Sequence, residues 1–171
     1  GPSVHLWVGD AILNAVAGAL PLVAALLRRE VRSFLYGTLS PDFYVGKGST
    51  GHEEHCHNWQ TGRKLLEDGE NDSEHAFALG YLVHLAADVI GHNYFVPNHL
   101  YRTFGLKRIG HASSELHADN FVGAGYRKLA SALVSEPQEE NDRLLNGVIL
   151  RGVIPFTAKK RLFATWIALQ T

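Results

Sequence analysis

The chain has 171 residues, of which 46% are hydrophobic and 19% charged, and its formal net charge is −1. This balance is typical of a globular chain that buries a proper core, and it argues against a polyanion partner, so we expect no stable nucleic-acid partner. No apolar run reaches the roughly 18 uncharged residues of a membrane span, and the single cysteine, Cys56, excludes an internal disulfide framework. We expect one domain over residues 1–171, in a protein that is either cytoplasmic or secreted.

Apolar residues recur at helical spacing along most of the chain, and turn residues separate the periodic stretches. Pro21 suits the first turn of a helix. Ser73 is expected to cap the longest apolar helix, and Pro97 is expected to close it. The predicted helices are 4–19, 20–36, 59–67, 73–94, 109–134, 142–151 and 158–169. Because no sustained strand pattern occurs, we predict an all-α fold, a multi-helix bundle.

Histidine is the outlier of the composition, with ten residues against sixteen lysines and arginines. Eight of the ten fall between residues 54 and 118, and such clustering is the composition of a metal-binding protein. These eight are His55, His57, His75, His84, His92, His99, His111 and His117.

The longest apolar helix carries His84, Asp88 and His92 at intervals of four residues. Residues i and i+4 lie on the same side of a helix, so His84 and Asp88 can bind one metal ion. Each further step of four drifts around the axis, so His92 need not serve the same ion. A buried carboxylate must be satisfied, which leaves two readings open: a metal site, or a histidine-aspartate hydrogen bond within the core.

Other polar residues repeat or extend this pattern. His111 and Glu115 are again four residues apart, although such pairs are also common on helix surfaces. Asp42 follows a proline in a predicted turn, where it is either a capping residue or a carboxylate ligand held by a stiff loop. The segment 52–57 is rich in histidine, and His5 lies near the start of the first helix.

Taken in chain order, these residues are His5, Asp42, His55 or His57, His84, Asp88, His92, His111 and Glu115. Their order and type resemble the zinc-dependent phospholipase C family, whose fold is shared with the P1-type nucleases. The early His-Leu-Trp and the Pro-Asp pair look like two of the family's ligand motifs, and the two i, i+4 pairs match its two helical motifs. Of the two loop histidines, His55 is favoured. The resemblance covers roughly 4–121 and implies a bundle of the phospholipase C and P1 nuclease type.

The resemblance also implies a cofactor of two or three zinc ions. One ion would be held by Asp42, His55, His84 and Asp88, a second by His92, His111 and Glu115, and a third by His5, Asp88 and the chain's own terminal amine and carbonyl. The chain departs from the family in two places. Gly1 stands where the family has an N-terminal tryptophan, and the interval from Asp88 to His92 is shorter.

The expected reaction is hydrolysis of a phosphodiester, in a phospholipid or another small molecule, by metal-activated water that Asp42 or Glu115 orients or deprotonates. Three alternatives stay open: a P1-like nuclease, a zinc-cluster hydrolase or cyclase acting on a non-phosphate substrate, and a non-catalytic metal-binding module. A nuclease needs aromatic side chains on which bases stack, for which the sequence offers Tyr44, Trp59, Tyr94 and Phe95. One cysteine among many carboxylates favours open, catalytic coordination over a closed structural site.

Overall fold

A computed structural model of the chain describes residues 1–44, 56–98, 107–149 and 154–169, with side chains from residue 113 onward in the third range. Throughout these ranges the regular elements are helical, which confirms the predicted all-α class. The elements are α1 (Pro2–Ala19), α2 (Pro21–Arg29), α3 (Val31–Gly37), η1 (Ser40–Phe43), α4 (Trp59–Asp68), α5 (Asp72–Ile90), η3 (Gly91–Phe95), α7 (Lys107–Val122), α8 (Ala124–Ser135), α9 (Glu139–Val148) and α10 (Phe156–Leu169).

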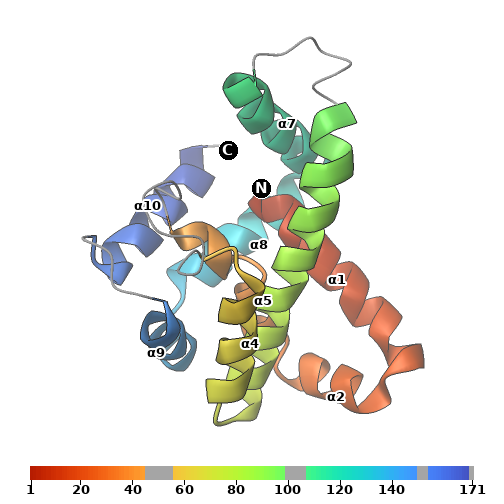
Figure 1. Cartoon of the computed structure of the whole chain (residues 1–171), viewed down its shortest axis with the longest axis vertical. Coiled ribbons are helices and arrows are strands. Elements are labelled where there is room, and N and C mark those ends of the chain that lie inside the picture. Colours follow the sequence, from red (N-terminus) through yellow and green to blue (C-terminus); the bar gives the residue numbers. More distant parts are fainter. Residues whose placement is uncertain (45–55, 99–106, 150–153, 170–171) are drawn as a thin grey trace.

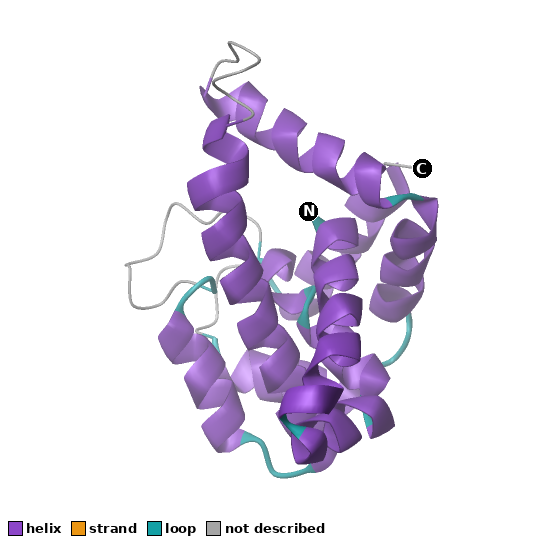
Figure 2. Cartoon of the chain, turned by 90° about the vertical axis from the view of Figure 1, so that its right-hand side faces the viewer, coloured by secondary structure: helices purple, strands orange, loops and turns teal. Residues whose placement is uncertain are grey.

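Helix α5 is the axis of the molecule, and α1, α3 and α4 pack against it. Figure 1 shows α5 running through the centre, with α4 beside its lower half, α7 near its upper end, and α9 and α10 on the other side of the core. In Figures 1 and 2 the N-terminus lies in the middle of the molecule rather than at its edge. The first turn of α1 is therefore positioned to contribute to an interior site.

Helices α3 and α5 cross with their backbones in contact, at Gly37 and Gly80. A Cβ atom added to Gly37 would lie 2.1 Å from the carbonyl oxygen of Phe77, and one added to Gly80 would lie 2.0 Å from that of Phe34. Glycine at both positions lets two helices that bury large aromatic side chains approach this closely. On α5 the crossing at Gly80 lies one turn before His84. It therefore also determines the distance between the end of α3 and that histidine.

Two predicted helices are each broken in two. The predicted helix 20–36 is interrupted at Glu30, whose φ of −108° and ψ of 36° are not helical. The predicted helix 109–134 is interrupted at Gly123, which has a φ of 99°. Helical periodicity continues across both positions, because the helices on each side bury faces of the same core. At Gly123 the helix is interrupted by a positive φ, which glycine adopts without steric cost.

The start and the end of α5 also differ from prediction. Asn71, rather than Ser73, is the capping residue, and its side chain accepts a hydrogen bond from the backbone N–H of Glu74 at 3.0 Å. The Ser73 hydroxyl instead hydrogen-bonds that of Ser33 at 2.8 Å, which ties α5 to α3. Helical backbone continues through Pro97, so this proline does not close the helix. Its missing N–H is tolerated because the preceding turn is wider than an α-helical one.

A polar contact fastens the C-terminal helices to the core. The Tyr36 hydroxyl on α3 donates a hydrogen bond to Asp142 on α9, and Lys160 on α10 donates to the same carboxylate at 2.8 Å. Burial, together with the charge and hydrogen bond of Asp142, raises the pKa of Tyr36 far above its usual value, so the phenol stays protonated and remains the donor. One carboxylate thus joins three helices.

Candidate metal centre

His84 is fully buried on α5, and the structure fixes which of its ring nitrogens carries the proton. Its Nδ1 lies 2.8 Å from the carbonyl oxygen of Thr38, at the end of α3. A carbonyl oxygen only accepts, so Nδ1 is the donor and Nε2 presents its lone pair. That Nε2 lies 3.4 Å from an oxygen of Asp88, one turn further along α5. The close crossing of α3 and α5 therefore orients this imidazole.

Asp42 and His57 meet the same pair from a different side of the site. The 3₁₀ turn η1 directs the half-buried Asp42 inward, and its Oδ1 lies 3.4 Å from His57 Nε2 and 3.9 Å from His84 Nε2. The Nε2 atoms of His57 and His84 are 3.2 Å apart. The loop histidine that faces the cluster is His57, whereas the favoured His55 lies outside the described residues.

His5 comes from the first turn of α1. Its ring stacks on that of His84 with 3.7 Å between centroids and 15° between planes, and its Nε2 lies 3.4 Å from Asp88 Oδ1. Burial, with help from His84 and the terminal amine, holds the pKa of His5 well below its usual value. The imidazole is therefore neutral, which is the form that binds metal.

The carboxylate of Asp88 lies between two pairs of histidines. Its Oδ2 faces His57 at 3.3 Å and His84 at 3.4 Å, while its Oδ1 faces His5 at 3.4 Å and His92 at 3.6 Å. Burial alone would raise the pKa of Asp88, but the neighbouring imidazoles, that of His84 foremost, hold it below its usual value. An ionised carboxylate with a different histidine pair at each oxygen can bridge two cations.

His92 reaches Asp88 from the first turn of η3, a π-helix that directly follows α5. In an α-helix each step of four residues drifts around the axis, and the wider π turn offsets this drift. His92 consequently faces the same carboxylate as His84, but at its other oxygen. Short π segments within helices often occur at functional sites.

A pocket of about 430 Å³ opens beside the cluster. Its polar wall includes Glu115 from α7, which lines the same space as Asp88 and His92. Leu85, Val89 and Trp59 supply the apolar part of its lining. His111 lies on α7, one turn before Glu115, but its side chain is outside the described part. The pocket therefore combines acidic and imidazole groups with apolar surface, and it has room for a small substrate.

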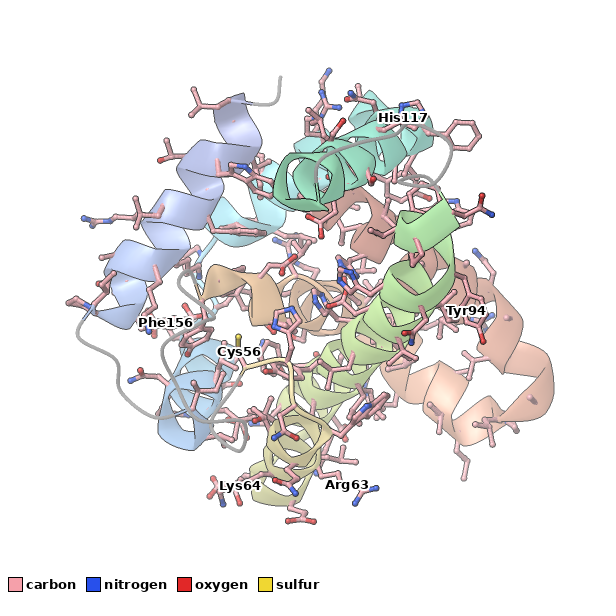
Figure 3. The ribbon with its side chains drawn as sticks, turned by 45° about the horizontal axis from the view of Figure 1, so that its top comes forward. Cys56, Arg63, Lys64, Tyr94, His117 and Phe156 are labelled. Carbon is pink, nitrogen blue, oxygen red and sulfur yellow. The ribbon has the colours of Figure 1, made fainter. Side chains whose placement is uncertain are left out.

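Sequence reasoning missed the contacts that orient His57. Its Nδ1 lies 3.2 Å from the Cys56 sulfur, and the buried Tyr81 hydroxyl on α5 donates to the Cys56 carbonyl oxygen. Figure 3 shows Cys56 near the middle of the molecule. The signal available in the sequence was a lone cysteine directly before a histidine.

The chain's first residue has partners of its own. The Gly1 carbonyl oxygen accepts a hydrogen bond from the His5 backbone N–H at 3.3 Å, and the terminal amine lies 3.9 Å from the carboxylate of Asp119 on α7. The expected role of this amine and carbonyl as ligands of a third ion stays a prediction.

The donor atoms fit zinc. Imidazole nitrogens and carboxylate oxygens are the ligands that zinc takes in catalytic sites. The ligand atoms of His5, Asp42 and His84 lie within 4.8 Å of one another, and so do those of His57, His84 and Asp88. Four histidines around two carboxylates supply more donors than one ion needs, so the cluster can hold more than one.

Comparison with known proteins agrees with this chemistry. A family model described as zinc-dependent phospholipase C matches residues 4–152, which is most of the chain. No curated protein and no solved structure matches the chain. Among the described residues, no helix is both long and apolar enough to cross a membrane.

Proposed function

The chain belongs to the zinc-dependent phospholipase C family, and on that premise we propose that it is an enzyme that hydrolyses phosphodiesters, phospholipids foremost. The observation that carries this proposal is the carboxylate of Asp88, which faces a different pair of histidines with each oxygen at the edge of an open pocket. A purely structural metal site is closed by its protein ligands, whereas this cluster borders space for a substrate.

We assign the zinc ligands by combining the family motifs with this geometry. One ion is assigned to Asp42, His57, His84 and Asp88, with His57 taking the place first given to His55. A second is assigned to His92, His111 and Glu115, and a third to His5 together with Asp88. Thr38 and Cys56 hold the outer nitrogens of two of these histidines, a role whose loss typically weakens metal affinity tenfold or more.

The reaction adds water across a P–O bond. When bound, zinc supplies charge neutralisation of the phosphate and lowers the pKa of a coordinated water towards about 7. Glu115 lines the pocket and takes the proton of the attacking water, whose oxygen forms the new bond to phosphorus. The bond to the alcohol breaks, and the alcohol oxygen leaves with the proton that Glu115 took from the water. Asp42, which contacts His57, orients the reacting groups.

A P1-like nuclease is the second candidate, and one observation favours it. Among the four aromatic residues considered for base stacking, Trp59 lines the pocket and is 47% exposed. Tyr44 is buried, and Tyr94 and Phe95 are exposed but are not among the residues that line this pocket. Base stacking on one aromatic ring is worth about 1–3 kcal/mol, so Trp59→Ala would weaken binding of a single strand.

The test compares two substrates on zinc-loaded protein: a short-chain phosphatidylcholine and single-stranded DNA. We expect hydrolysis of the phospholipid, its loss in His84→Ala, and its retention in His75→Ala. His75 is a matched control because it lies on α5 but outside the cluster. Hydrolysis of DNA alone would favour the nuclease. Zinc binding without hydrolysis of either phosphodiester would contradict the proposal and direct attention to carbonyl substrates or to a non-catalytic module.

A further inference from the structure

We infer that Asp119 is a positioning residue: from α7 it caps the first turn of α1 and thereby holds His5 against His84 and Asp88. The inference rests on the proposed zinc-dependent function, because positioning matters only if His5 serves the metal centre.

Helix α1 has no cap within its own sequence. Its N-cap residue is Gly1, no side chain of the helix start makes a capping hydrogen bond, and its first turn holds no acidic residue. The first N–H groups of a helix lack intrahelical partners. Asp119, from a distant part of the chain, supplies a hydrogen-bond partner for one of these groups: its Oδ1 accepts a hydrogen bond from the Val4 N–H at 3.0 Å. A carboxylate there also complements the positive end of the helix dipole.

The Asp119 side chain is closely packed against the start of α1. Its side chain is only 1% exposed, and a buried carboxylate is costly unless it is paired. Its partners include the Val4 and Ser3 N–H groups and the terminal amine, all at the start of α1. The fit is tight, because a Cβ atom added to Gly1 would lie 2.5 Å from Asp119 Oδ2.

The contact between Asp119 and Val4 affects the position of His5, the next residue. His5 follows Val4, and its imidazole keeps its place only while the first turn of α1 is ordered. The stack on His84 at 3.7 Å and the approach to Asp88 at 3.4 Å both depend on that turn. Glu115 lies one turn before Asp119 on α7, so the same contact sets the position of Glu115 relative to His5 across the site.

The experiment measures zinc affinity by titrating the metal-free full chain against a competing chromophoric chelator. Asp119→Ala is expected to weaken the affinity about tenfold, the scale of other residues that orient ligands. Asp119→Asn keeps an acceptor oxygen, and asparagine caps helices about as well as aspartate, so its affinity should stay within about threefold of wild type. Asp10→Ala is the matched control, because Asp10 also ties α1 to another helix, accepting from the Tyr126 hydroxyl at 2.9 Å.

A merely structural role for Asp119 predicts a different pattern. Both alanine variants would lower the urea midpoint of the metal-free protein, and neither would change zinc affinity selectively. Wild-type affinity in Asp119→Ala, or an equal loss in Asp10→Ala, overturns the inference while leaving the proposed function intact. Absence of zinc binding by wild type instead overturns the proposed function itself. If Asp119→Ala does not fold, Asp119→Glu replaces it: its longer carboxylate displaces the turn, and unchanged affinity there also overturns the inference.

Discussion

The crossing of α3 and α5 gives the sharpest prediction about the scaffold. In Gly80→Ala the new Cβ atom would lie 2.0 Å from the Phe34 carbonyl oxygen and 3.0 Å from its carbon. An ordinary contact begins near 3.4 Å, so the two backbones must separate by about 1.4 Å at this point. The atoms in the way belong to the Phe34 backbone, which cannot relieve the clash by changing a side-chain rotamer. The separation would also lengthen the 2.8 Å contact between His84 and Thr38.

Two opposing effects decide the size of the change. Alanine gains about 1 kcal/mol over glycine in helix propensity, whereas overpacking costs about 1–3 kcal/mol, or more where backbone must move. We therefore expect Gly80→Ala to lose about 2 kcal/mol of unfolding free energy and to bind zinc more weakly. Urea denaturation of the metal-free protein and a zinc titration measure the two effects.

The control is Gly18→Ala on α1, where an added Cβ atom meets nothing within 4 Å. There the propensity gain acts alone, so this variant should be as stable as wild type or more so. Equal stability of Gly80→Ala and wild type would refute the claim that the crossing is tight. Lost stability with unchanged zinc affinity would refute the claim that the crossing orients His84.

Three further variants probe other contacts. Tyr81→Phe removes the hydroxyl that holds the Cys56 carbonyl, and we expect zinc affinity to fall about tenfold in a chelator titration. Asp142→Asn weakens the contact with Lys160 and should cost about 1–3 kcal/mol in urea unfolding, with zinc content unchanged. The pKa of Asp88 is depressed in the folded state, so its ionised form stabilises the metal-free fold above pH of about 4. The stability gap between wild type and Asp88→Asn should therefore close as pH falls below that value.

The helical class was predictable because it depends on local spacing, and the family was recognisable because the order and type of the polar residues resemble its ligand motifs. The i, i+4 interval of His84 and Asp88 reads directly as one side of a helix, and both residues do meet on α5. The break at Gly123 was not predictable, because the apolar pattern runs across it. The α5 cap at Asn71 was misplaced because Ser73, an equally good capping residue by type, is engaged with another helix.

The arrangement of the site depends on tertiary contacts that no spacing shows. The chain order placed His5 among the ligands, but its stacking on His84 follows from where α1 crosses α5. The contact between Thr38 and His84 was not predictable, because it is made by the backbone carbonyl of Thr38 and not by its side chain. The approach of His57 to Asp88 is likewise a tertiary contact that the sequence does not show, and the choice between His57 and the favoured His55 as the loop ligand stays a prediction. The ligand set as a whole stays a prediction.

The most direct test of the account is elemental analysis of zinc in purified wild type and in His84→Ala. The cluster around Asp88 predicts two or three zinc ions per chain in wild type and at least one fewer in the variant, because His84 contacts both Asp42 and Asp88. Wild-type protein without zinc, and a variant of unchanged stability, would contradict the account, since these histidines would then be no more than polar residues of a helical core.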